Sequence, residues 1–266
     1  MQSAASDLAL LVDAAREAGA LARELLRKPL EEHNKGALGP VTNVDYAVDT
    51  LLAQRLLGAR PDYGWLSEET PDELERRVGK ARTFMLDPID GTGALVSKVP
   101  QWTISIGIIE GQRAFVGVVY NPMTDEMFAG AIGEGATLNG RPMRTSLASK
   151  IEGARVIGQR NRFSERRWAK PWPKMDVIER QSLAYRLALV AAGQGDATIL
   201  FGWKHDWDIA AGIALVEAAG GVVTDLWGQP LLLNQDVPRV PGVVASGAPL
   251  HPLLIERTST LPELQT

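Results

Sequence analysis

Cysteine is absent from the 266-residue chain, and histidine occurs only three times, as His33, His205 and His251. The lack of thiols excludes disulfides, zinc–thiolate sites, iron–sulfur clusters and thiol nucleophiles, and it suits a reducing compartment, so we expect a cytoplasmic protein. The histidines lack the spacing of an HExxH metal site, and the chain has no GxSxG elbow, phosphate-binding P-loop or strand-linked GxGxxG. Carboxylates remain as the candidate chemical groups.

Neither an excess of positive charge nor a long hydrophobic run is present. Lys and Arg number 28 against 32 Asp and Glu, a formal net charge of −4, so we expect neither nucleic acid nor a membrane as partner. Charged residues interrupt the first apolar stretch, which argues against a signal peptide or a spanning helix. The hydrophobic fraction of 45% is ordinary for a folded protein.

Hydrophobic periodicity predicts two kinds of organisation. In the first half, helices at 7–28 and 44–57 and strands at 63–66 and 82–86 precede β-rich runs at 103–109, 114–120 and 126–131, which indicate an antiparallel meander. In the second half, strands at 155–158, 175–179, 197–201 and 222–225 alternate with helices at 164–170, 183–192 and 209–219, as in α/β layers. We predict an N-terminal α+β domain, residues 1–148, and a C-terminal α/β domain, residues 149–266.

The sequence Asp-Pro-Ile-Asp-Gly-Thr at residues 87–92 is the strongest candidate site. An apolar strand delivers Asp87 and Asp90 into a turn at its carboxyl end, where ligand sites of α/β proteins lie. The two carboxylates and the Ile89 carbonyl offer hard oxygen ligands for divalent cations. Gly91 permits close approach of backbone N–H groups to an anion, and Thr92 can begin a short helix.

Other acidic positions have both a structural and a functional interpretation. Asp45 would complete a capping box with Thr42, and Glu68 with Glu69 would begin a helix. Asp208 would cap the apolar helix that follows it. Taken separately, each position favours the structural interpretation.

Taken in chain order, these segments resemble the inositol monophosphatase superfamily of metal-dependent phosphomonoesterases, which includes fructose-1,6-bisphosphatases and 3′(2′),5′-bisphosphate nucleotidases. The matching motifs are Val-Thr-Asn-Val-Asp at 41–45, Leu-Ser-Glu-Glu at 66–69, the segment at 87–92, Trp-Asp at 207–208 and Gly-Gly at 220–221. Supporting matches lie at 117–122 and 135–140, so the resemblance covers essentially the whole chain.

This resemblance implies a layered αβαβα sandwich, a homodimer, two or three Mg²⁺ ions, inhibition by lithium and a small phosphorylated metabolite as substrate. It implies that Glu68, Asp87 and the Ile89 carbonyl hold one metal, that Asp87, Asp90 and Asp208 hold a second, and that Glu68 holds a weaker third through water. It also implies that Asp45 and Thr92, with Glu68, orient the attacking water, and that the N–H groups of Gly91 and Thr92 bind the phosphate. Elementary electrostatics favours such an allocation, because clustered carboxylates repel one another unless divalent cations neutralise them.

Two departures from the family pattern concern the substrate. Gly-Ala-Leu at 93–95 replaces a more polar sequence, and residues 199–205 lack the acidic residue with which inositol monophosphatases bind inositol hydroxyls. This leaves room for an aromatic and basic pocket, in which Trp203 stacks on a base and Lys204 or His205 meets a second phosphate; a packed loop is the alternative. Inositol monophosphate and 3′-phosphoadenosine 5′-phosphate are therefore rival substrates. A regulatory protein-binding role and a calcium-binding module are the alternatives.

Overall fold

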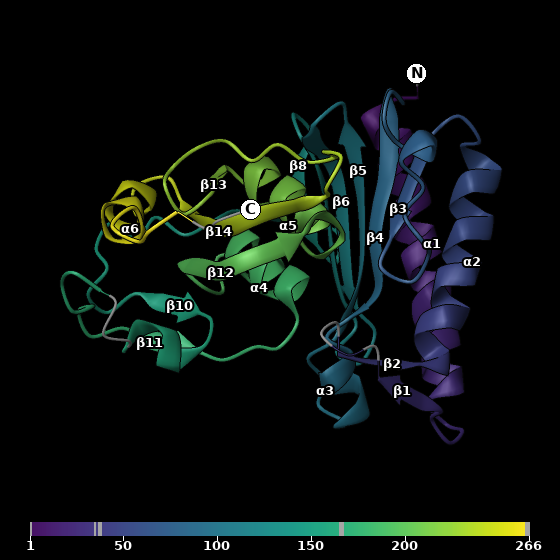
Figure 1. Ribbon diagram of the computed structural model, residues 1–266, viewed down its shortest axis with the longest axis horizontal. Helices are drawn as coiled ribbons and strands as arrows, with labels where there is room; N and C mark the ends of the chain where they lie inside the picture. Colours follow the sequence, from purple (N-terminus) through teal and green to yellow (C-terminus); the bar gives the residue numbers. More distant parts are fainter. Residues whose placement is uncertain (1, 35, 37–38, 165–167, 264–266) are drawn as a thin grey trace.

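Five layers of helix and sheet make up the computed structural model, which describes residues 2–34, 36, 39–164 and 168–263 (Figure 1). Helices α1 (Ala4–Leu25) and α2 (Asn43–Ala59) cover one face of a seven-stranded sheet. Helices α4 (Leu183–Ala191) and α5 (Asp206–Ala218) lie between that sheet and a five-stranded one, whose outer face carries α6 (His251–Thr258). The predicted αβαβα sandwich is confirmed.

The seven-stranded sheet contains the predicted meander. Its strands follow one another in chain order, and all neighbours are antiparallel except the first pair, which is parallel. They are β3 (Gly64–Ser67), β4 (Arg82–Asp90), β5 (Thr103–Glu110), β6 (Arg113–Asn121), β7 (Glu126–Ala131), β8 (Gly135–Leu138) and β9 (Arg141–Met143).

The five-stranded sheet is mixed, with the order β11-β10-β12-β14-β13. Its strands are β10 (Arg155–Ile157), β11 (Asp176–Ile178), β12 (Ala197–His205), β13 (Gly221–Thr224) and β14 (Arg239–Gly247). Strand β10 is parallel to β11 and β12, whereas β14 is antiparallel to β12 and β13. A small hairpin of β1 (Glu32–Asn34) and β2 (Pro40–Thr42), the five-residue helix α3 (Thr92–Val96) and two 3₁₀ turns (Leu74–Arg76 and Arg160–Phe163) complete the described elements.

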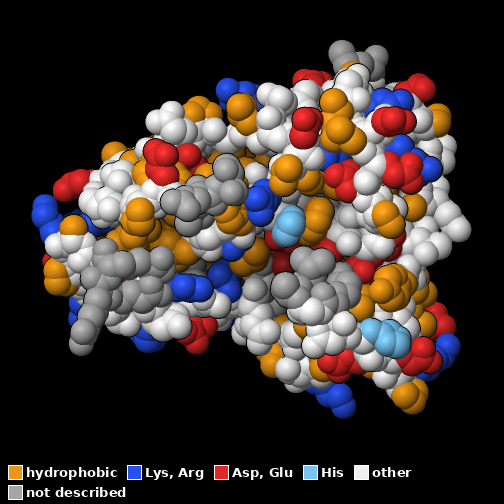
Figure 2. Space-filling model, in the orientation of Figure 1, with side chains coloured by type: hydrophobic (Ala, Val, Ile, Leu, Met, Phe, Trp, Pro, Cys, Tyr) orange, Lys and Arg blue, Asp and Glu red, His pale blue; other side chains and the backbone are white. Residues whose placement is uncertain are grey.

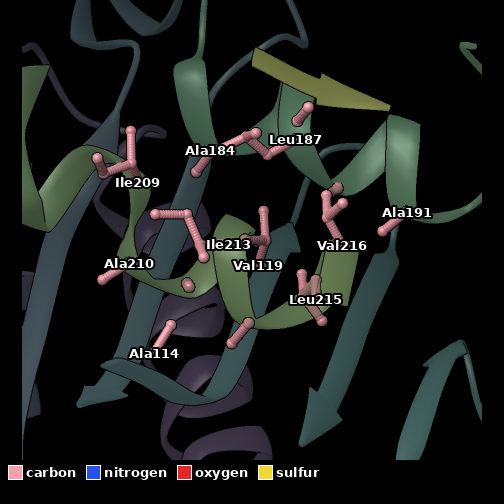
Figure 3. Packing of buried hydrophobic residues seen from close by; sticks show 14 of the residues in the cluster. Ala114, Val119, Ala184, Leu187, Ala191, Ile209, Ala210, Ile213, Leu215 and Val216 are labelled. Carbon is pink, nitrogen blue, oxygen red and sulfur yellow. The ribbon is translucent and has the colours of Figure 1, made fainter. Parts of the chain in front are cut away.

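Helix α5 lies directly on the seven-stranded sheet because the sheet presents glycine there. A Cβ atom at Gly107 of β5 would lie 2.9 Å from the Ala211 nitrogen, and one at Gly117 of β6 would collide with the Ala211 carbonyl. Around this contact, residues such as Val119, Ile209 and Ile213 form a continuous apolar cluster between the two sheets (Figure 3). The close approach fixes how far the first turn of α5 lies from β4 and β5.

Several predicted elements need correction. Strand β4 continues to Asp90 instead of ending at 86, because its pairing with β5 shifts register between Asp87 and Asp90 and then resumes. The described part of the predicted helix at 164–170 is not helical, since prolines at 171 and 173 follow closely and disfavour helix before them; residues 165–167 lie outside the described part. No helix begins at Glu68 among the described residues, and α5 begins at Asp206, before the predicted position 209.

The predicted domain division falls in an irregular segment between β9 and β10. The apolar cluster around α4 and α5 is continuous between the two sheets, and the division into domains at 1–148 and 149–266 stays a prediction. None of the described helices combines the length and apolar character needed to cross a membrane.

Candidate metal centre

Three carboxylates from distant parts of the chain meet at the edge of the seven-stranded sheet. Glu68 follows β3, Asp87 belongs to β4, and Asp208 lies in the first turn of α5. One oxygen from each lies within 4.8 Å of the others. The space-filling view shows acidic side chains gathered in a hollow near the centre of the molecule (Figure 2). Three oxygens at this spacing are suited to binding a divalent cation between them.

Strand pairing explains why Glu68 lies beside Asp87. Strands β3 and β4 are parallel, with Ser67 opposite Leu86, and the Glu68 N–H donates to the Leu86 carbonyl over 3.2 Å. Parallel strands point the same way, so Glu68 and Asp87, which follow the paired residues Ser67 and Leu86, lie beside each other at the same edge of the sheet. Asp208 arrives from the far side, through the helix that packs on β5 and β6.

Asp45 confirms the structural interpretation that the sequence left open, and its second oxygen contacts the segment at 87–92. It is the third residue of α2 and completes a capping box, since its Oδ2 accepts from the Thr42 N–H at 2.9 Å and from the Thr42 hydroxyl at 2.6 Å. Its other oxygen, Oδ1, lies 2.9 Å from the Thr92 hydroxyl, which is also 3.0 Å from the Ile89 carbonyl. With two acceptors for its one proton, the Thr92 hydroxyl keeps a lone pair with which to accept a hydrogen bond from water.

Asp90 lines the same cavity but is not one of the three clustered carboxylates. Its carboxylate accepts from the Ser182 hydroxyl at 2.6 Å and from the backbone N–H groups of Ala184 at 2.6 Å and Leu183 at 3.2 Å. The irregular pairing of β4 with β5 separates Asp90 from Asp87 and directs it to the start of α4. Sequence reasoning missed Ser182, because its capping role is a local signal whereas its contact with Asp90 spans 92 residues.

Gly91 occupies the backbone position that the sequence predicted. Its φ of +98° lies in the left-handed region, which glycine adopts without strain. A Cβ atom there would also lie 3.1 Å from the Gln101 carbonyl. The turn between Asp90 and Thr92 therefore depends on glycine both for its backbone angle and for its space.

Burial and mutual repulsion act together on the acids. Burial, followed by the charges of Glu68, Asp90, Asp208 and Asp45, raises the pKa of Asp87 well above its usual range. The pKa of Asp208 is raised for the same reasons, with Lys204 partly opposing the shift. Burial raises the pKa of Asp90 to about 6 although its hydrogen bonds oppose this. A divalent cation would remove the repulsion, so the donor set fits Mg²⁺ or a similar hard cation.

The predicted substrate-binding residues separate into two groups. Trp203 and His205 line a cavity of about 370 Å³ together with the acidic residues and Trp207, whereas Lys204 is not among the lining residues. The Lys204 ammonium donates to the Trp203 carbonyl over 3.0 Å, and burial lowers its pKa. The Arg239 guanidinium covers one face of Trp203 at 4.5 Å, and His205 stacks on Trp207 at 4.2 Å. The cavity lining therefore combines acidic and aromatic side chains.

Known proteins with similar sequences and structures extend these observations. The model of the inositol monophosphatase family matches residues 4–263. Inositol monophosphatase 1 of Solanum lycopersicum is 32% identical over 228 residues, covering 82% of this chain and 84% of that protein. Nus factor SuhB of Escherichia coli (strain K12) is 33% identical over 232 residues, covering 83% and 85%. The solved structure of the extragenic suppressor protein suhB from Bartonella henselae has a TM-score of 0.83 at 27% identity, covering 95% of this chain and 98% of that one.

These matches extend over nearly the entire chain and include the segments that carry Glu68, Asp87 and Asp208. The architecture agrees with them, since the layers of helix and sheet are those of the solved relatives. The resemblance noted from the motifs is thereby confirmed, and the chain belongs to the inositol monophosphatase family.

Proposed function

We propose that the protein is a Mg²⁺-dependent phosphomonoesterase acting on a small phosphorylated metabolite. The observation that carries the proposal is the convergence of Glu68, Asp87 and Asp208 within 4.8 Å beside a cavity of about 370 Å³. Family membership supports a phosphatase. A cavity of this size suits a small molecule, and its lining includes the three clustered acids together with Trp203, His205 and Trp207.

Under this proposal, different residues would bind the metal ions, orient the attacking water and bind the phosphate. Glu68, Asp87 and the Ile89 carbonyl would hold one ion, and Asp87, Asp90 and Asp208 a second, with Glu68 supporting a weaker third through water. Bound Mg²⁺ would supply a water of lowered pKa and would screen the phosphate charge.

Thr92, whose hydroxyl Asp45 holds at 2.9 Å, would accept a hydrogen bond from the attacking water and orient it, together with Glu68. The backbone N–H groups of Gly91 and Thr92 would bind the phosphate oxygens. No covalent phosphoenzyme is needed, because the water attacks phosphorus in line with the leaving oxygen.

Two substrate classes are proposed, inositol monophosphate and 3′-phosphoadenosine 5′-phosphate. The name of the tomato relative supports the first. The rings of Trp203 and His205 in the cavity lining support the second, since a nucleobase can stack on an aromatic ring. Phosphate release should be measured with Mg²⁺ on both compounds and on fructose 1,6-bisphosphate. The preference in kcat/KM would name the substrate class.

Asp87→Asn is the control for this assay, because it removes a charge from the centre of the acidic cluster with little change in shape. We expect the substitution to abolish metal-dependent turnover. Wild-type activity in this variant would refute the assignment of the metal ligands. Tight Ca²⁺ binding by the wild-type protein without hydrolysis of any substrate would instead support the calcium-binding module.

A regulatory role is the second candidate function, supported by the similarity to Nus factor SuhB of Escherichia coli. Under this alternative the protein acts through a protein partner, and Asp87→Asn should leave that interaction intact while turnover is lost. The homodimer, the lithium inhibition and the cytoplasmic location belong to the same set of proposals. Light scattering, inhibition assays and cell fractionation would test them in turn.

A further inference from the structure

Arg77 is an arginine with no solvent exposure, and it lies outside the acidic cluster. Its guanidinium makes two hydrogen bonds to the Asp72 carboxylate, at 2.6 and 2.7 Å, which neutralise its charge. Its remaining contacts go to a distant loop: the Asn234 side-chain oxygen at 3.0 Å, the Gln235 carbonyl at 2.8 Å and the Asp236 carbonyl at 3.2 Å. Burying an arginine is costly unless its donors are satisfied, so this geometry is strongly specified.

The loop that Arg77 holds is in turn bonded to α5. The Asn234 N–H donates to Asp206 Oδ2 over 2.7 Å, and the Asp206 N–H donates to the Pro238 carbonyl over 3.0 Å. Asn234 has a φ of +61°, a left-handed conformation in which Asn is one of the more tolerated residues. Asp206 is buried in the first turn of α5, two residues before Asp208. The loop therefore links Arg77 to the turn that carries Asp208.

At its other end, Arg77 is fixed to the strands that carry the remaining acids. It lies in the connection between β3 and β4, and its carbonyl accepts from the Thr83 hydroxyl of β4 over 3.3 Å. Gly64 of β3 packs so closely that a Cβ atom there would lie 2.8 Å from the Arg77 Cα atom. Glu68 and Asp87 belong to the ends of these same two strands.

We propose that Arg77 is a positioning residue for the metal centre, which holds the first turn of α5 against β3 and β4 through Asn234 and Asp206. The inference rests on the proposed metal-binding function. Repulsion among Glu68, Asp87 and Asp208 tends to push Asp208 away, and a buried link of hydrogen bonds resists that displacement. Because Asp72 pairs with the guanidinium, Arg77 acts on the centre mainly through the geometry of its donors.

Arg77→Lys tests this idea, because lysine keeps the charge but cannot supply the planar fork of donors to Asp72 and the loop together. The matched control is Arg82→Lys. Arg82 is also buried and bonded to carboxylates, those of Asp7 and Glu110, but none of the hydrogen bonds described for its side chain reaches the loop that contains Asn234. Binding of Mn²⁺ is followed by titration calorimetry, beside thermal unfolding and the Mg²⁺ dependence of turnover.

We expect Arg77→Lys to weaken Mn²⁺ binding about tenfold or more, as is usual when a residue that orients metal ligands is altered. Arg82→Lys should lower the unfolding temperature without changing metal affinity. In an Asp208→Asn background, Arg77→Lys should cost little further affinity, since the link acts through Asp208. Asn234→Gly, which keeps the left-handed backbone and removes the side-chain acceptor, should also weaken Mn²⁺ binding.

Metal affinity within about twofold of wild type in both Arg77→Lys and Asn234→Gly would overturn the proposal, whatever happens to the unfolding temperature. Asn234→Gly keeps the test valid if Arg77→Lys does not fold. Failure of the wild-type protein to bind Mn²⁺ would overturn the metal centre itself, and the positioning role with it. Normal wild-type binding with unaffected variants would overturn the positioning role alone.

Discussion

Replacing Asp206 by asparagine should stabilise the metal-free protein at alkaline pH. Burial raises the pKa of Asp206 to about 7 from its ordinary value of 3.8, and in the described part of the chain its Oδ1 atom is buried without a hydrogen-bond partner. The folded state therefore keeps a proton that the unfolded state has released. The resulting penalty is absent below about pH 4, grows as the pH rises, and is complete above about pH 7.

The size of this loss of stability follows from the difference between the pKa values of Asp206 in the folded and unfolded states. About three pKa units at 1.36 kcal/mol each amount to about 4 kcal/mol. Asparagine removes the penalty and keeps an oxygen that can accept from the Asn234 N–H. It also loses the attraction to Arg77 and buries an amide N–H₂ without a partner, which costs about 1–3 kcal/mol. We therefore expect a net gain of about 1–3 kcal/mol at pH 8.

Urea denaturation in the presence of a chelator, repeated from pH 4 to pH 8, measures this effect. The difference between variant and wild type isolates Asp206, because Asp87, Asp90 and Asp208 contribute the same pH dependence to both proteins. The variant should be less stable or equal near pH 4 and more stable at pH 8. A variant that is less stable throughout, with a difference that does not change with pH, would refute the reasoning.

Three further perturbations address the metal, the packing and the substrate wall. Affinity for Mn²⁺ should increase between about pH 6 and pH 8, because the metal competes with protons on Asp87, Asp90 and Asp208. Burial raises the pKa values of all three carboxyl groups. A constant affinity in calorimetry over this range would contradict the prediction. Gly117→Ala should lower the free energy of unfolding in urea by about 1–3 kcal/mol, since its methyl group meets the Ala211 carbonyl, whereas Gly58→Ala, exposed on α2, should not. Trp203→Ala should raise KM for 3′-phosphoadenosine 5′-phosphate about tenfold and leave inositol 1-phosphate little affected; equal effects would exclude base stacking.

Much of the fold could be predicted because its signals are local. Alternating apolar residues with short turns predict β5, β6 and β7, and the apolar spacing of α1 and α2 predicts two amphipathic helices, all within a few residues of the observed bounds. Strand β14 and helix α6 were not predicted, although β14 pairs with both β12 and β13. The pattern of β14 does not stand out by itself, and its place depends on strands distant in the chain.

The sequence by itself determined the family, since the order of motifs from Asp45 to Asp208 indicated the one that the comparisons confirmed. It could not determine that Asp90 bonds to Ser182 at the start of α4, or that Arg77 reaches Asn234, 157 residues away. Only the tertiary structure decided these contacts. Caps, turns and periodic patterns are set by neighbours a few positions apart, whereas contacts between distant segments depend on strand register and on the close packing of α5 against the glycines of the sheet.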